Sequence, residues 1–261
     1  MTNLVRAEIR KLTSTRMWLG LTLGGLVLVA FYVTVIAFTA GTTARGGTAL
    51  PSLADPGTVR TVYGVPFEIG FLMPMILGVT LVAGEFRHHT ITPTFLATPR
   101  RERVVIAKVV VAGGAGLAMG ALFTAVAAAV GAIVIAARGY PVMLGSNGVP
   151  RLLVLMVVGL GVWCIFGVGF GALLKNQVAA IVTALALVTI VEGLLTLLLR
   201  WVHLAGVAEY LPSNASSAMV APAGTKASEL LPWWGGGLAL LGWGLVCALV
   251  GAAVTLRRDV S

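Results

Sequence analysis

Six long apolar runs dominate this chain and restrict it to folds that are stable inside a lipid bilayer. A helix needs roughly 20 apolar residues to cross the hydrocarbon core, and all six runs are about that long. The runs are continuous rather than alternating, which favours helices over the strands of a membrane barrel. We therefore expect an all-α integral membrane protein with one transmembrane domain, residues 1–261. The expected spans are residues 17–41, 64–84, 104–137, 152–174, 177–199 and 233–256.

The composition excludes an ordinary soluble domain. Apolar residues make up 58% of the chain and charged residues only 10%, whereas soluble domains carry about 25% charged residues. The first run is longer than the apolar region of a secretory signal peptide, which has about 7 to 15 residues. We therefore interpret residues 17–41 as a retained span rather than a cleaved leader.

Lysine and arginine are distributed unevenly between alternate connections, which predicts the orientation of the spans. With a cytoplasmic N-terminus, the cytoplasmic segments hold twice as many of these residues as the outer ones. We therefore expect a multi-pass protein of the inner (plasma) membrane with both termini in the cytoplasm, and the Ala-, Val- and Gly-rich composition indicates a bacterial source. The net charge of +9 follows from this bias and from contact with anionic lipid headgroups. No nucleic-acid partner is expected.

Residues 1–16 precede the first span and have the pattern of an amphipathic helix. Val5, Ile9 and Leu12 recur at helical spacing on one face. Such a helix is expected to lie in the cytoplasmic interface with its basic side chains toward lipid phosphates. The alternative is a generic basic anchor, which explains the charge but not the apolar stripe. The basic residues concerned are Arg6, Arg10, Lys11 and Arg16.

Residues 85–103 connect the second and third spans and contain a helix start of their own. Thr98 fits the N-cap position, and Pro99 fits the first helical position, where its missing N–H is harmless. The third helix would then run from Pro99 to about Ala137, which is longer than a bilayer core. Its first turns are therefore expected in the cytoplasm. The segment from Phe86 to Ala97 is too short to be a stable helix on its own. The connection combines aromatic residues with a capped helix start, so we favour a partner surface over a plain linker.

Three features resemble the permease subunit of a type-2 ATP-binding-cassette (ABC) exporter. They are the leader ending LTSTRMWLG, the loop GEFRHHTITPTFLATPRRERVVIAK, and six spans with a very short connection between the fourth and fifth. The resemblance covers essentially the whole chain, and the loop is its most discriminating part. His89 departs from the family pattern, where many relatives have a small residue before the threonine.

The resemblance implies a type-2 ABC exporter fold and a division of labour between subunits. Residues 1–16 would be an elbow helix, and residues 85–103 a coupling loop that docks on a separate ATPase subunit. Two ATPase subunits would serve each complex, beside a second permease copy or a paralogous permease, and residues 200–232 would form the outer loop. The residues implied in the ATPase contact are Glu85, Phe86, Arg87, Thr90, Leu96, Thr98, Pro99, Arg100, Lys175 and Asn176.

Motifs for nucleotide binding and enzyme catalysis are missing from the sequence. The chain has no Gly-Lys dipeptide and therefore no phosphate-binding loop. ATP and magnesium would then bind to the partner ATPase, and this chain would carry no cofactor. Zinc-protease and nucleophile-elbow motifs are also missing. We accordingly expect no catalytic residue and no metal site.

Two carboxylates are candidates for a role inside the membrane. Glu192 lies deep in the fifth run, and Glu68 lies near the expected outer end of the second. Intramembrane carboxylates usually face protein or water, so Glu192 is either a pathway residue or a hydrogen-bonded structural one. Glu68 is more simply explained by an interfacial position.

The substrate class follows only loosely from the spans. Their apolar interior suits a lipid, a hydrophobic drug or an amphipathic peptide equally well. One alternative function is an ion-coupled secondary transporter, although such proteins usually show several deep carboxylates and internal repeats. A structural membrane protein without catalysis is the other alternative.

Overall fold

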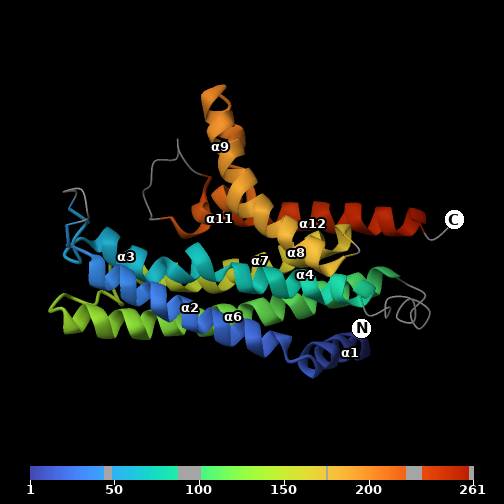
Figure 1. The fold of residues 1–261 in the computed structure, drawn as a ribbon, viewed down its shortest axis with the longest axis horizontal. Coiled ribbons are helices and arrows are strands. Elements are labelled where there is room, and N and C mark those ends of the chain that lie inside the picture. Colours follow the sequence, from blue (N-terminus) through green and yellow to red (C-terminus); the bar gives the residue numbers. More distant parts are fainter. Residues whose placement is uncertain (44–48, 88–100, 175, 222–230, 259–261) are drawn as a thin grey trace.

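The computed structural model describes residues 1–43, 49–87, 101–174, 176–221 and 231–258, and its architecture is helical (Figure 1). Within these ranges the only strand-like feature is one isolated antiparallel bridge between Thr43 and Ala49. The elements in chain order are α1 (Thr2–Ser14), α2 (Met17–Thr39), α3 (Pro56–Val65), η1 (Pro66–Gly70), α4 (Leu72–Arg87), α6 (Arg101–Ala137), α7 (Val149–Leu173), α8 (Gln177–Ala186), η2 (Leu187–Val191), α9 (Glu192–Trp201), α10 (Ala205–Ala208), α11 (Pro212–Val220) and α12 (Trp233–Arg258).

Six helical segments in the described part are long and apolar enough to cross a membrane, which confirms an all-α protein of multi-pass character. Two of them, the second and the fifth, are interrupted by short π-helical stretches, η1 and η2. The segments are Met17–Thr39, Pro56–Arg87, Arg103–Ala137, Val149–Leu173, Gln177–Trp201 and Trp233–Val250.

The second segment begins at Pro56, about two turns before the position expected from hydropathy. Asp55 explains the early start, because its side chain accepts a hydrogen bond from Thr58 N at 3.1 Å. Pro56 then occupies the first helical position. This start moves Glu68 away from the end of the segment and into η1, where its side chain is exposed.

Helix α7 forms the centre of the bundle and packs against α4, α6 and α12. Its contact faces are lined by glycines, so that backbones approach closely, as is typical of membrane helices. A Cβ atom built on Gly167 would overlap the carbonyl oxygen of Met75 in α4. One built on Gly169 would overlap Gly244 O in α12. At these two positions α7 therefore requires glycine, because the backbones of α4 and α12 occupy the space of a side chain.

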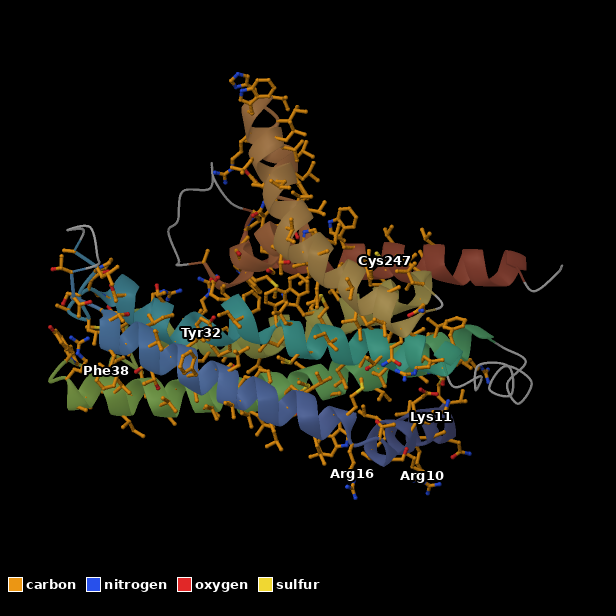
Figure 2. The ribbon with its side chains drawn as sticks, in the orientation of Figure 1. Arg10, Lys11, Arg16, Tyr32, Phe38 and Cys247 are labelled. Carbon is orange, nitrogen blue, oxygen red and sulfur yellow. The ribbon has the colours of Figure 1, made fainter. Side chains whose placement is uncertain are left out.

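Helix α9 leaves the bundle at a steep angle (Figure 1). Its side chains are strongly apolar, and many are exposed, including Leu197 and Trp201. Helix α2 also presents a bare apolar face, on which Phe38 and Tyr32 project outward (Figure 2). In a bilayer these faces are available to lipid or to another membrane helix.

The connections separate the molecule into two ends. Helix α1, the last turn of α4 and the first turn of α6 lie together at one end, which we call the α1 end (Figure 1). Helix α3 and the connection between α6 and α7 lie at the opposite end. Helix α6 contains 37 residues, and at 1.5 Å per residue it is roughly 55 Å long, well beyond a bilayer core of about 30 Å.

Candidate functional site

The face that α1 turns toward the bundle carries charged residues. Glu8 is the most buried residue of α1, with 4% of its surface exposed, whereas Ile9 of the predicted apolar stripe is 46% exposed. Leu12 packs against the hydrophobic core. Figure 2 shows Lys11 directed toward the bundle and Arg10 and Arg16 directed away from it.

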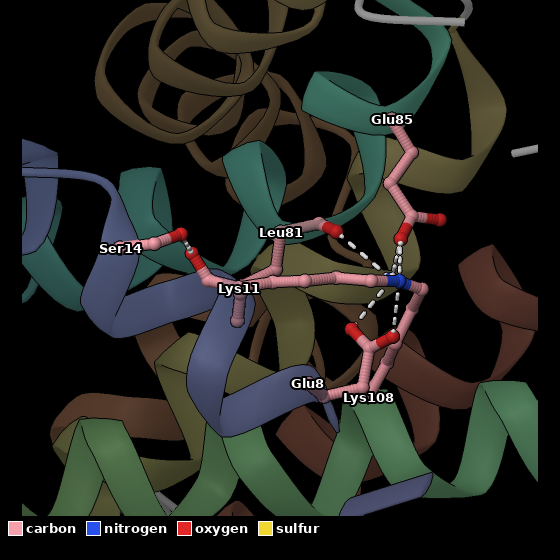
Figure 3. Close-up of polar contacts among 6 residues, drawn as sticks. All are labelled: Glu8, Lys11, Ser14, Leu81, Glu85 and Lys108. Atoms are coloured by element: carbon pink, nitrogen blue, oxygen red, sulfur yellow. Dashed lines mark hydrogen bonds and ion pairs between the residues drawn. The ribbon is translucent and has the colours of Figure 1, made fainter. Parts of the chain in front are cut away.

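Four charged side chains from three helices form a ring of ion pairs at the α1 end (Figure 3). Lys11 Nζ lies 2.8 Å from Glu8 Oε1 and 2.7 Å from Glu85 Oε1. Lys108 Nζ lies 2.8 Å from Glu8 Oε2 and 2.8 Å from the same Glu85 oxygen. Two carboxylates and two ammonium groups therefore alternate, and each contacts both members of opposite sign.

The ring is built from helices that are distant in the sequence. Glu8 and Lys11 are one turn apart on α1, Glu85 lies in the last turns of α4, and Lys108 lies two turns into α6. Lys108 also donates a hydrogen bond to the carbonyl oxygen of Leu81 at 3.2 Å. The Lys108, Glu8 and Glu85 side chains are at most 8% exposed, while that of Lys11 is 41% exposed.

The ring changes the ionisation of its α1 members. Burial opposes ionisation of Glu8, but the charge and hydrogen bonds of Lys108, with those of Lys11, outweigh it and hold the pKa of Glu8 below its ordinary value of 4.5. Burial likewise opposes the charged form of Lys11. Its hydrogen bonds to Glu8 and Glu85 outweigh that effect and raise the pKa of Lys11 above 10.5.

The predicted ATPase-contact residues fall into different environments. Glu85 is buried in the ring, Phe86 is half-buried against the core, and Arg87 is exposed. Asn176 caps α8, because its side-chain oxygen accepts hydrogen bonds from Val178 N at 2.9 Å and Ala179 N at 3.1 Å. The others, Thr90, Leu96, Thr98, Pro99, Arg100 and Lys175, lie outside the described residues.

The basic residues predicted for a membrane-facing elbow are also divided. Arg6, Arg10 and Arg16 are exposed, and Figure 2 shows Arg10 and Arg16 directed away from the bundle. Lys11 points the other way and pairs with Glu8 and Glu85. The placement of α1 along a membrane surface stays a prediction, now with three arginines rather than four basic residues available to lipid.

Glu192 is buried, and both its carboxylate oxygens accept hydrogen bonds from Ser213. The backbone N–H of Ser213 donates to Oε1, and its hydroxyl donates to Oε2 at 2.8 Å. Asn214 adds two contacts, because its Nδ2 donates to Thr196 Oγ1 at 3.0 Å and to Ala208 O at 2.8 Å. The start of α11 is thereby fixed to α9, which favours the structural interpretation of Glu192.

Two arginines at the end opposite the α1 end donate hydrogen bonds to backbone carbonyl oxygens. Arg138 donates to Ala37 O at 2.6 Å and to Ala40 O at 2.8 Å, which satisfies the end of α2. Arg60 donates to Asn147 O and Val220 O, both at 3.1 Å, and so links α3 to the end of α11. In the prediction of orientation, these arginines count only as positive charges. In the structure, each of them fixes the end of a helix.

Sequence reasoning missed Glu8 and Lys108 as functional residues. Neither residue is among the predicted site residues, because lysines and arginines enter the sequence analysis only through their uneven distribution between connections, apart from those of residues 1–16 and 85–103. A signal was present, because Glu8 and Lys11 have the i,i+3 spacing of a helical ion pair. Lys108 also stands within an apolar run, where an unpaired charge is costly.

Comparison with known proteins adds no family to this description. No protein-family model matches the chain, and no curated protein matches it. Within the described ranges, no group of three or more His, Cys, Asp or Glu residues is placed to hold a metal ion. The ring at the α1 end joins residues from three helices and lies beside the predicted ATPase contact.

Proposed function

We propose that this chain is the transmembrane permease subunit of an ATP-driven ABC exporter. The observation that carries the proposal is the position of the ring, which joins α1 to the helix ends on either side of residues 88–100. The sequence resemblance assigns the ATPase contact to residues 85–103. An interaction with a partner there would act directly on α4 and α6.

The proposed mechanism uses the rigid packing of the bundle to pass movement inward. The partner ATPase binds ATP and magnesium, and its closure displaces the ends of α4 and α6. Helix α4 packs tightly on α7 through Gly167 and Met75, so the displacement reaches the centre of the bundle. A nucleotide can drive such a change only if the ATPase contacts differ between the two states.

The exposed apolar faces of α2 and α9 support assembly with a second permease. Such a partner is a second copy of this chain or a paralogous permease, with the translocation route between the two. The exported substrate is proposed to be a lipid, a drug or an amphipathic peptide. An apolar route of this kind needs no deep charged site.

The proposal is tested by co-expressing the chain with candidate ABC ATPase subunits and measuring co-purification and ATP hydrolysis in lipid nanodiscs. Arg87→Ala is the informative variant because Arg87 is exposed at the end of α4. Glu85→Ala is a poor choice, since it would also break the ring. We expect Arg87→Ala to weaken assembly or hydrolysis, while Arg200→Ala, an exposed control in α9, leaves both unchanged.

Failure of the wild-type chain to assemble with the ATPase would count against this function. The ion-coupled alternative is separated by energising vesicles in two ways, with ATP alone or with a proton gradient after ATP depletion. Export that depends on ATP and ignores the gradient supports the permease. Export driven by the gradient alone would overturn the proposal.

A further inference from the structure

We propose that the ring of Glu8, Lys11, Glu85 and Lys108 is a coupling joint that makes α1 move together with the ends of α4 and α6. Lys108 is the residue that positions α1 and α4 relative to α6. The inference rests on the proposed function for its purpose, since it adds α1 to the parts that a partner ATPase would move. Glu8 and Lys108 lie outside the set that the sequence resemblance assigns to the ATPase contact.

The surroundings of Lys108 carry the assignment. Its ammonium group lies within 3.2 Å of three oxygens, from Glu8, Glu85 and Leu81. An ammonium group has three N–H donors, so each can be directed to one of these oxygens. The side chain is 7% exposed, and water has little access to replace a lost contact. Lys108 therefore fixes α6, α1 and α4 at a single point.

Glu85 makes the arrangement a joint rather than a pair of separate contacts. Lys11 from α1 and Lys108 from α6 both lie against the same oxygen, Glu85 Oε1. Any displacement of the last turns of α4 must either carry both lysines along or break two ion pairs at once. Removing one partner of a buried ion pair is strongly unfavourable, so the three helix ends are expected to move as a unit.

The apolar contacts of α1 include Leu12, which packs against the core, but they do not account for its position beside α4. Ile9 is 46% exposed, and α1 contacts the bundle mainly along α6. The connection of α1 to α4 runs through Lys11 and Glu85. Without the ring, α1 would keep its covalent link to α2 but lose its fixed position beside α4.

The joint is tested by hydrogen exchange of the α1 amides in the full chain, reconstituted in lipid nanodiscs. We expect Lys108→Met to speed exchange in α1 by about 100-fold or more, the factor that corresponds to losing a buried charge partner. Lys11→Met is the milder second variant, because Lys11 is partly exposed. Arg10→Met is the matched control, since Arg10 neighbours Lys11 in sequence but points away from the ring.

A second readout separates coupling from simple stability. In the complex with the ATPase, trapping with ATP, magnesium and vanadate should change exchange in α1, α4 and α6 of the wild-type chain. In Lys11→Met the response of α1 should be weakened but not lost, because Lys108 still contacts Glu8 and Glu85. In Glu8→Met/Lys11→Met, which removes both α1 members and leaves the Glu85–Lys108 pair, the α1 response should disappear while those of α4 and α6 persist. Lys11→Arg, which keeps the charge at a partly exposed site, should keep the α1 response.

Unchanged α1 exchange in both Lys108→Met and Lys11→Met would overturn the joint, as would an α1 response to nucleotide that survives in full in Glu8→Met/Lys11→Met. A wild-type chain that assembles with no ATPase would instead contradict the proposed function. In that case the exchange of the chain alone still decides whether the ring holds α1. The two ideas can thus fail separately.

Discussion

Lys108 Nζ and Glu8 Oε2 lie 2.8 Å apart although 100 residues separate them in the chain. Both side chains are almost fully buried, so neither charge can be satisfied by water if the other is removed. The contact fixes the N-terminal helix to the third membrane segment, and it does so next to Glu85 at the end of the second.

Removal of Lys108 alone should therefore cost more stability than removal of Lys108 and Glu8 together. In Lys108→Met, two carboxylates share the single ammonium of Lys11, and about 3–5 kcal/mol is expected to be lost. In the double variant with Glu8→Met, one acid and one base disappear, and Lys11 still pairs with Glu85. Most of the loss should then be recovered.

A double-mutant cycle on the free energy of unfolding, measured in mixed micelles, checks this prediction. Arg10→Met controls for loss of a basic side chain from α1 without loss of a ring contact. Additive effects of the two methionine substitutions would show that Glu8 and Lys108 do not stabilise one another.

The ring also predicts how stability depends on acid. Because the pKa of Glu8 is lower in the folded chain than its ordinary 4.5, the unfolded chain binds more protons at low pH. The contribution of Glu8 is present above pH 4.5 and is lost as the pH falls through the native value. The unfolding midpoint of the wild-type chain should fall over this window, and the fall should be shallower in Glu8→Met/Lys108→Met. Equal slopes would contradict the assignment.

At alkaline pH, stability should fall as the pH rises, because the group concerned is Lys11. The pKa of Lys11 is raised above 10.5 in the folded chain, so its contribution is complete below that pH. The contribution is lost as the pH rises through the native value. Lys11→Arg should remove this dependence because guanidinium stays charged. The same unfolding assay, carried above about pH 10.5, makes the comparison.

Glu192 should behave as a structural acceptor. Glu192→Leu leaves the partly buried N–H of Ser213 without its partner, which should cost about 1–3 kcal/mol. Glu192→Gln keeps one acceptor oxygen and should cost less. Glu68→Gln is the control, since Glu68 is exposed in η1. Thermal unfolding gives the loss of stability in the three variants. A loss in Glu192→Gln as large as that in Glu192→Leu would show that the negative charge is needed.

Because α4 packs closely on α7, adding even one methyl group at the contact should destabilise the folded chain. Gly167→Ala brings a Cβ atom into Met75 O, and the overpacking should cost about 1–3 kcal/mol. Gly114→Ala in α6 is the matched control, because nothing lies within 4 Å of a Cβ built there. The control should be neutral or slightly stabilising, since alanine favours helices more than glycine does. Equal effects of the two substitutions would refute the close contact.

Helices were easier to anticipate from the sequence than contacts between them. Hydropathy placed all six membrane segments because each is a local property of about 20 residues. It placed the start of the second too late, since the early turns from Pro56 are amphipathic and are set by the cap at Asp55. The hydropathy of the runs does not distinguish the π-helical stretches η1 and η2 from the α-helix around them.

The ring shows why the site was harder to predict than the spans. Its members are spread from Glu8 to Lys108, and no spacing rule connects α1 to α6. Counting lysines and arginines treats Lys11 and Arg10 alike, yet the structure separates them by direction (Figure 2). That separation arises from the packing of α1 on α6, which only the three-dimensional fold determines.

The balance of charge in the ring has an electrical consequence. Moving one elementary charge across the whole of a 100 mV membrane potential takes roughly 2.3 kcal/mol. Two carboxylates and two ammonium groups moving together carry no net charge, so the electrical work on Glu8 and Glu85 cancels that on Lys11 and Lys108. A joint of this composition adds no voltage dependence to the movement of α1, and it would work equally well in energised and de-energised cells.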